Sequence, residues 1–164
     1  GRHEMRVLRG QGGAVGLDTH KIGSCGVSAG GHLAISCALL GEPKSLETKS
    51  PETKISGMPD FAGLLYPGIP DGAEQAIESR SAPESVTRPI CPMFIVNARV
   101  DELTPAEKCV EFYASLLKAG VNAEIHVFSK GSHGFGMGAG RGNSTALWPT
   151  SFVAWLRDCG IVED

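Results

Sequence analysis

The sequence predicts a three-layer α/β/α domain built on a mostly parallel β-sheet. Short apolar segments of strand length alternate with longer segments whose apolar residues recur at helical spacing. Parallel strands joined in this order need crossover connections, and these place helices on both faces of the sheet. The length of 164 residues, without an internal repeat, suits a single domain that covers residues 1–164.

In the first half of the chain, residues 2–16 suggest the end of a helix followed by a glycine-rich turn. Residues 22–27 are small and apolar, which suits a strand buried on both faces. Helical spacing then covers residues 29–40, and a polar surface excursion is expected at 44–57. A second strand is expected at 61–66, because the apolar run there ends at a Pro-Gly pair.

The second half begins with a long connection over residues 68–89 that includes a short helical stretch, an arrangement typical of functional insertions. A third strand is expected at 93–97, followed by a helix from Thr104-Pro105 to Lys118 with proline in its first turn. Alternation predicts a fourth strand at 123–128. A glycine-rich loop and a last helix that begins at Trp148 complete the expected order.

Composition excludes several classes of function. Eighteen acidic and fifteen basic side chains give a net charge of −3 without a run of either sign, so no nucleic-acid partner is expected. Hydrophobic residues make up 41% of the chain, yet no apolar run reaches the length of a membrane span and no signal peptide is recognisable. We therefore expect a soluble globular protein without a membrane partner.

The cysteines and histidines indicate neither a metal site nor a disulfide framework. Five cysteines, an odd number without a CxxC pair, favour free thiols in the cytoplasm over a secreted, partly bridged protein. The five histidines lack the spacing of metal ligands. No metal or cofactor is expected.

The sharpest motif is Gly26-Val27-Ser28-Ala29-Gly30, which matches G-x-S-x-G between an expected strand and an expected helix. In that context the serine occupies a strained turn, with glycines on both sides to leave room, and its hydroxyl is exposed at the carboxyl edge of the sheet. The amide of Ala29, at the start of the helix, is positioned to bind a developing oxyanion.

A serine nucleophile needs a base that a third group orients. Asp101 follows the strand at 93–97 and His133 follows the strand at 123–128. Because parallel strands end at one edge of a sheet, both side chains should lie near Ser28. The sequence therefore predicts a catalytic triad of Ser28, Asp101 and His133. His32, in the helix after the turn, is expected to be packed or hydrogen-bonded instead of acting as the base.

Segments 22–33, 60–67, 98–105 and 131–135, together with the tryptophans of the last helix, resemble the acetyl-esterase branch of the α/β-hydrolases. Relatives in that branch include acetyl xylan esterases, feruloyl esterases and xylanase homologues. The resemblance implies hydrolysis of short acyl esters, often acetyl groups on carbohydrate, without a cofactor. Tyr66 and Pro67, at the end of a strand, would then line the acyl pocket or simply terminate the strand.

The chain departs from that family at its front, where relatives have further strands and an oxyanion loop. Gln11, Gly12 and Gly13 are a poor substitute for this loop, because they precede the strand that leads to the nucleophile. We expect a partial α/β-hydrolase fold, its carboxyl-terminal portion, that lacks a neighbour for the strand at 22–27. A second copy of the chain, in a two-fold dimer, is the expected cover for this edge.

The residues thus favour a serine carboxylic ester hydrolase with a small-molecule ester as substrate. Two rivals remain open at this point. One is a peptidase of the prolyl-oligopeptidase group, which shares this order of catalytic residues. The other is a catalytically weak remnant that serves as a structural or interaction module.

Overall fold

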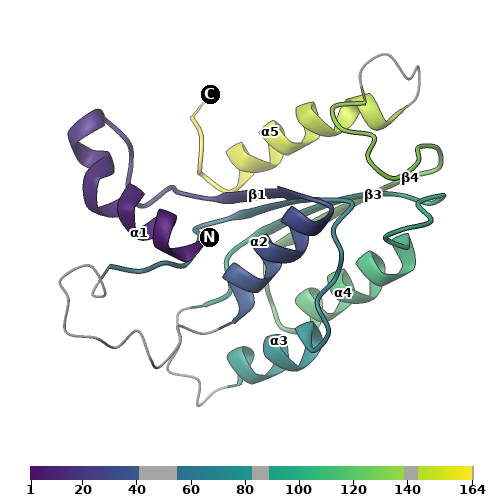
Figure 1. Cartoon of the computed structure of the whole chain (residues 1–164), viewed down its shortest axis with the longest axis horizontal. Coiled ribbons are helices and arrows are strands. Elements are labelled where there is room, and N and C mark those ends of the chain that lie inside the picture. The colour runs from purple at the N-terminus through teal and green to yellow at the C-terminus, as the bar shows by residue number, and fades with distance from the viewer. Residues whose placement is uncertain (41–54, 83–88, 139–143, 164) are drawn as a thin grey trace.

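A computed structural model describes residues 1–40, 55–82, 89–138 and 144–163 of the chain (Figure 1). Most of the polar excursion expected at 44–57, and the last part of the glycine-rich loop, lie outside the described residues.

Four parallel strands form the sheet, in the order β1-β2-β3-β4. This confirms the parallel sheet predicted from the alternating pattern. In the register, Val27 pairs with Leu65, Leu65 with Val96, and Val96 with His126. The carboxyl ends of the strands therefore lie at a common edge, where the predicted site residues follow. The strands are Ser24–Val27 (β1), Ala62–Leu65 (β2), Met93–Ala98 (β3) and Ala123–Phe128 (β4).

Helices cover both faces of this sheet, as predicted. Helices α2, α3 and α4 lie on one face and α5 on the other, whereas α1 lies beside the start of β1 (Figure 1). None of the helices in the described residues is long and apolar enough to cross a membrane. The helices are Arg2–Gln11 (α1), Ala29–Leu39 (α2), Ala73–Ser81 (α3), Ala106–Lys118 (α4) and Trp148–Asp158 (α5), and a short 3-10 helix, Gly12–Val15 (η1), follows α1.

Alternating side chains of β2 and β3 divide the core into two layers. Toward α2, α3 and α4, Leu64 and Ile95 are fully buried and pack with Phe112 of α4. Toward α5, Phe94 packs with Trp155, at a ring-centroid distance of 5.5 Å. Because β2 and β3 have helices on both sides, their sequences are almost continuously apolar.

Strand β1 differs from the prediction, because it is not buried on both faces. It forms one edge of the sheet, and Val27 is 49% exposed while Cys25 is also exposed. Helix α5 packs over the inner strands, where Phe152 lies beside Gly63 and Phe94, and it leaves this face of β1 open. The edge position is the one expected for a strand that lacks a neighbour. Its cover by a second copy stays a prediction.

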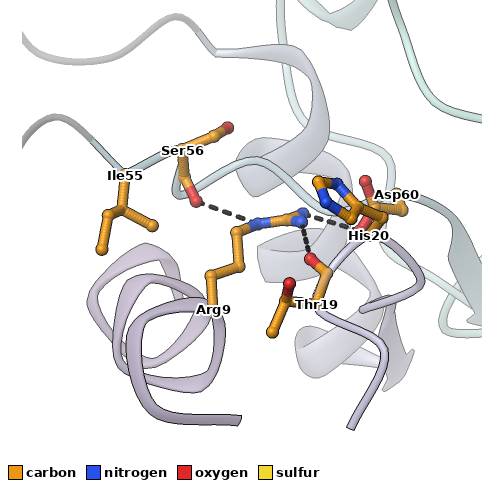
Figure 2. Close-up of a pocket in the computed structure, with 6 residues that line it drawn as sticks. All are labelled: Arg9, Thr19, His20, Ile55, Ser56 and Asp60. Atoms are coloured by element: carbon orange, nitrogen blue, oxygen red, sulfur yellow. Dashed lines mark hydrogen bonds and ion pairs between the residues drawn. The ribbon is translucent and has the colours of Figure 1, made fainter. Parts of the chain in front are cut away.

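Helix α1 is tied to the amino-terminal end of the sheet by a buried ion pair. Arg9 Nη2 lies 2.7 Å from Asp60 Oδ2, and the two side chains are only 9% and 7% exposed. Arg9 also donates hydrogen bonds to the carbonyls of Thr19, Ser56 and Met58, and Asp60 accepts one from the Ile22 amide. Arg9 and Asp60 border a cavity of about 480 Å³ that Thr19, His20, Ile55 and Ser56 also line (Figure 2). Because the Arg9 and Asp60 side chains are paired with each other, we assign them a structural role, which is to hold α1 against the sheet.

Candidate active site

Ser28 forms the sharp turn between β1 and α2. Its backbone has φ 51° and ψ −119°, a strained conformation for any residue other than glycine. The end of β2 holds this turn in place, because the Ser28 amide donates to the Leu65 carbonyl at 3.0 Å. The Ser28 carbonyl accepts bonds from the amides of His32 and Gly68. The turn predicted from the G-x-S-x-G motif is therefore present, in its strained form.

The glycines around this turn are not equally required. A Cβ atom on Gly26 would lie 2.1 Å from the Gly30 carbonyl oxygen, so no side chain fits there. A Cβ atom on Gly31 would lie 2.6 Å from Pro67 Cβ, whereas one on Gly30 would meet open space. A glycine is thus required on each side of the serine, as expected. On the helix side, however, the crowded position is Gly31 and not the motif residue Gly30.

Ser28, His133 and Asp101 lie together at the carboxyl edge of the sheet, as predicted. Ser28 Oγ is 2.8 Å from His133 Nε2, and His133 Nδ1 is 2.9 Å from Asp101 Oδ2 and 3.1 Å from Oδ1. The His133 side chain is 20% exposed, while that of Asp101 is fully buried. Since an ionised carboxylate only accepts hydrogen bonds, the proton of a neutral His133 lies on Nδ1 and Nε2 accepts from the serine hydroxyl.

Asp101 is kept ionised by its hydrogen bonds. Burial by itself raises the pKa of this carboxyl, but donors from the Thr104 amide, His133, the Thr104 hydroxyl and the Leu103 amide outweigh it. The pKa of Asp101 is therefore lowered from its ordinary value of 3.8. A carboxylate charged at neutral pH can orient the imidazole and stabilise it when it becomes positive.

Tyr66 and Pro67, the predicted pocket residues, both lie beside the triad. Tyr66 follows β2 with a positive φ of 36°, and its ring meets the His133 ring edge-on at a centroid distance of 5.1 Å. The other side of Tyr66 packs against Phe135, at 4.7 Å. Pro67 contacts the helix turn at Gly31. The structure thus places Tyr66 in contact with the base and Pro67 in contact with the turn after the nucleophile.

Ala29 is the first residue of α2 and is exposed. Amides in the first turn of a helix have no acceptor within the helix, so this N–H group is available to an oxyanion. Gln11, Gly12 and Gly13 lie at the end of α1 and in η1, by the start of β1 and away from its carboxyl end (Figure 1). His32 is in α2, as expected, but it is exposed and not packed.

Sequence reasoning missed Thr104. Its hydroxyl oxygen lies 3.0 Å from Asp101 Oδ2, 3.2 Å from His133 Nδ1 and 3.1 Å from the Tyr66 carbonyl. A signal was available, because an aspartate side chain in a turn often accepts hydrogen bonds from the residues two or three positions later. Among the described residues, no group of three or more His, Cys, Asp or Glu side chains could hold a metal ion.

A family model described as the prolyl oligopeptidase family matches residues 13–160, which include Ser28, Asp101 and His133. The chain belongs to the prolyl oligopeptidase family. The match spans the turn at Ser28 and all four strands, in agreement with the α/β-hydrolase resemblance of the sequence.

Relatives with esterase names are similar to this chain. An acetylxylan esterase from Xylanibacter ruminicola is 24% identical over 158 residues. The match covers 82% of this chain and 30% of that protein. An acetyl ester-xyloside bifunctional hydrolase from Caldicellulosiruptor lactoaceticus superposes with a TM-score of 0.81 at 24% identity, over 99% of this chain and 65% of that one. At 24% identity, the superposition on the Caldicellulosiruptor hydrolase shows that the two chains share a fold.

Esterase 2 of Thermogutta terrifontis, in its form phosphorylated by paraoxon, superposes with a TM-score of 0.73 at 26% identity, over 98% of this chain and 62% of that one. The chain therefore spans less than two thirds of the length of these solved structures, and less than a third of the Xylanibacter esterase. The partial α/β-hydrolase fold expected from the sequence agrees with this coverage.

Proposed function

We propose that the chain is a serine carboxylic ester hydrolase that removes short, acetyl-like acyl groups, with Ser28 as nucleophile, His133 as base and Asp101 as the orienting acid. The observation that supports it most is the continuous hydrogen-bonded path from Ser28 Oγ through the His133 ring to Asp101, with bonds of 2.8 and 2.9 Å. Esterase names among the relatives point to the same chemistry.

In the proposed reaction, Ser28 Oγ attacks the ester carbonyl while its proton passes to His133 Nε2. The tetrahedral oxyanion accepts a hydrogen bond from the Ala29 amide. When the intermediate collapses, the C–O bond to the alcohol breaks and His133 returns its proton to the leaving oxygen. Water then attacks the acyl-serine with the same assistance, which releases the acid and regenerates Ser28. Tyr66 and Pro67 border the acyl group in this account.

Carbohydrate esters are the proposed natural class of substrate. This substrate class rests on two similar proteins, an acetylxylan esterase and an acetyl ester-xyloside bifunctional hydrolase. We expect acetyl esters to be hydrolysed with higher kcat/KM than octanoyl esters. A preference for octanoyl esters would contradict the proposed acyl class.

Hydrolysis of p-nitrophenyl acetate by the parent and by Ser28→Ala tests the proposal. Loss of the nucleophile should lower kcat by several orders of magnitude, because the rest of the triad acts only through it. Ser115→Ala, on α4, is the matched control, since the Ser115 hydroxyl bonds to the Glu111 carbonyl on the exposed side of that helix. Equal activity of Ser28→Ala and the parent would place the nucleophile elsewhere.

Peptide hydrolysis is the second candidate, favoured by the family match. The amine of a peptide bond leaves less readily than the alcohol of an ester, but the same triad serves both reactions. A chromogenic prolyl peptide assayed beside p-nitrophenyl acetate separates the two candidates. The ester hydrolase proposal expects turnover of the acetate and none of the peptide.

A further inference from the structure

The hydroxyl of Thr104 lies among three groups of the proposed active site. Its oxygen is 3.0 Å from Asp101 Oδ2, 3.2 Å from His133 Nδ1 and 3.1 Å from the carbonyl of Tyr66. A hydroxyl has one proton to donate, and a carboxylate and a carbonyl can only accept. Thr104 therefore donates either to Asp101, within the loop after β3, or to Tyr66, at the end of β2.

The two oxygens of Asp101 are held differently. Oδ1 accepts the backbone amides of Leu103 at 3.0 Å and of Thr104 at 2.8 Å. Oδ2 is the oxygen closer to His133, and within the described residues it lies within hydrogen-bond distance of the Thr104 hydroxyl as well as that ring. The backbone thus fixes one end of the carboxylate, while a single side chain fixes the end that faces the base.

Thr104 is itself held rigidly. The buried Asn97 side chain, at the end of β3, donates from Nδ2 to the Thr104 carbonyl at 2.8 Å. The Thr104 amide is bound to Asp101, and Pro105 with its fixed backbone follows immediately before α4. A hydroxyl on a backbone held at both its amide and its carbonyl can set the position of its neighbours.

The bond to Tyr66 extends this control to the end of β2. Tyr66 has a positive φ of 36°, and its ring contacts the His133 ring. Its amide donates to the Val96 carbonyl at 2.6 Å, so β3 holds the strained residue, and its carbonyl is the alternative acceptor for the Thr104 hydroxyl. The same hydroxyl therefore borders both surfaces that fix the imidazole, the carboxylate and the tyrosine ring.

We infer that Thr104 is a positioning residue whose hydroxyl donates to Asp101 Oδ2 and so orients the carboxylate against His133, with the Tyr66 carbonyl as its alternative acceptor. The expected effect of Thr104 on turnover rests on the proposed function, whereas its expected effect on the His133 ring does not. The contrasting interpretation is that Thr104 only closes the turn after Asp101, for which its backbone amide would suffice.

Thr104→Val tests the inference, because valine keeps the branched shape and removes only the hydroxyl. Thr104→Ser restores a hydroxyl, and Thr150→Val, at an exposed position of α5, is the matched control. In Thr104→Val, kcat for p-nitrophenyl acetate should fall about tenfold or more while KM changes less than about twofold, since a bond to a charged group is lost. Serine should recover most of the rate.

A second measurement is independent of activity. In protein with ¹⁵N-labelled histidine, the Nδ1-bound proton of His133 gives a low-field resonance that a His133→Gln variant assigns. We expect this resonance to broaden or shift in Thr104→Val and to persist in Thr104→Ser and Thr150→Val, with folding checked by thermal unfolding of each variant.

The outcomes distinguish the positioning role of Thr104 from the proposed function. A parental kcat and a parental resonance in Thr104→Val would overturn the positioning role, as would a serine variant impaired as much as the valine variant. If the parent hydrolyses no ester while the resonance still changes in Thr104→Val alone, the proposed function fails and the positioning role stands.

Discussion

Replacement of Gly26 by alanine should damage the nucleophile turn more than any other single methyl group added near Ser28. An alanine Cβ at this position would lie 2.1 Å from the Gly30 carbonyl oxygen and 2.7 Å from the Gly31 amide nitrogen. Ordinary contacts begin near 3.4 Å, so β1 and the start of α2 must separate by roughly 1 Å to admit the methyl group.

This separation has two measurable consequences. Overpacking against backbone, which cannot rotate away, should lower the free energy of unfolding by about 1–3 kcal/mol or more. A displacement of that size at the nucleophile should slow the reaction of Ser28 about 100-fold. Urea unfolding gives the first quantity, and the rate of labelling by a fluorophosphonate probe gives the second.

Gly30→Ala is the matched control, because a Cβ atom there has no atom within 4 Å. Alanine is also favoured over glycine inside a helix by about 1 kcal/mol, so this variant should be at least as stable as the parent. If Gly26→Ala unfolded and reacted like the parent, the close approach of β1 and α2 at this turn would be refuted.

Three further predictions concern the rest of the molecule. Because the pKa of Asp101 is lowered, its ionised form favours the folded state above the ordinary value of 3.8, and this contribution is lost as the pH falls below it. The free energy of unfolding should thus decline from pH 5 to pH 3 more steeply in the parent than in Asp101→Asn, and equal slopes would contradict the assignment. Arg9→Met should lower the free energy of unfolding by about 3 kcal/mol, since it removes the cation of the buried Arg9–Asp60 ion pair, whereas Lys108→Met, in an exposed pair, should unfold like the parent. The open edge of β1, with Val27 49% exposed, should be covered by a second copy, so light scattering should give the mass of a dimer and a strict monomer would refute this.

The sequence was sufficient to predict the elements whose patterns are local. Strands β2 and β3 are apolar almost throughout because helices cover both their faces, and this produces the uninterrupted runs that identify them. The meeting of these three side chains at one edge could be predicted because a parallel sheet brings the carboxyl ends of its strands together. The order of residues along the chain was enough to join Ser28, Asp101 and His133.

What the sequence did not predict depends on neighbours that are remote in the chain. Strand β1 reads as apolar and buried, but its exposure is decided by how far α5 extends across the sheet, which no local pattern encodes. Gly31 is crowded only because Pro67 packs against it from the end of β2. Thr104 reads as the start of a helix, whereas α4 begins at Ala106 and the threonine hydroxyl faces the triad.

The most direct test of the central claim is the site at which paraoxon reacts. A relative, the Thermogutta esterase 2, is phosphorylated by this compound. We expect paraoxon to add one diethylphosphoryl group to the chain, with release of p-nitrophenol. Peptide mapping by mass spectrometry should place this group on Ser28, and Ser28→Ala should stay unmodified. An unmodified parent, or a group mapped to another residue, would contradict the assignment of Ser28 as the activated nucleophile.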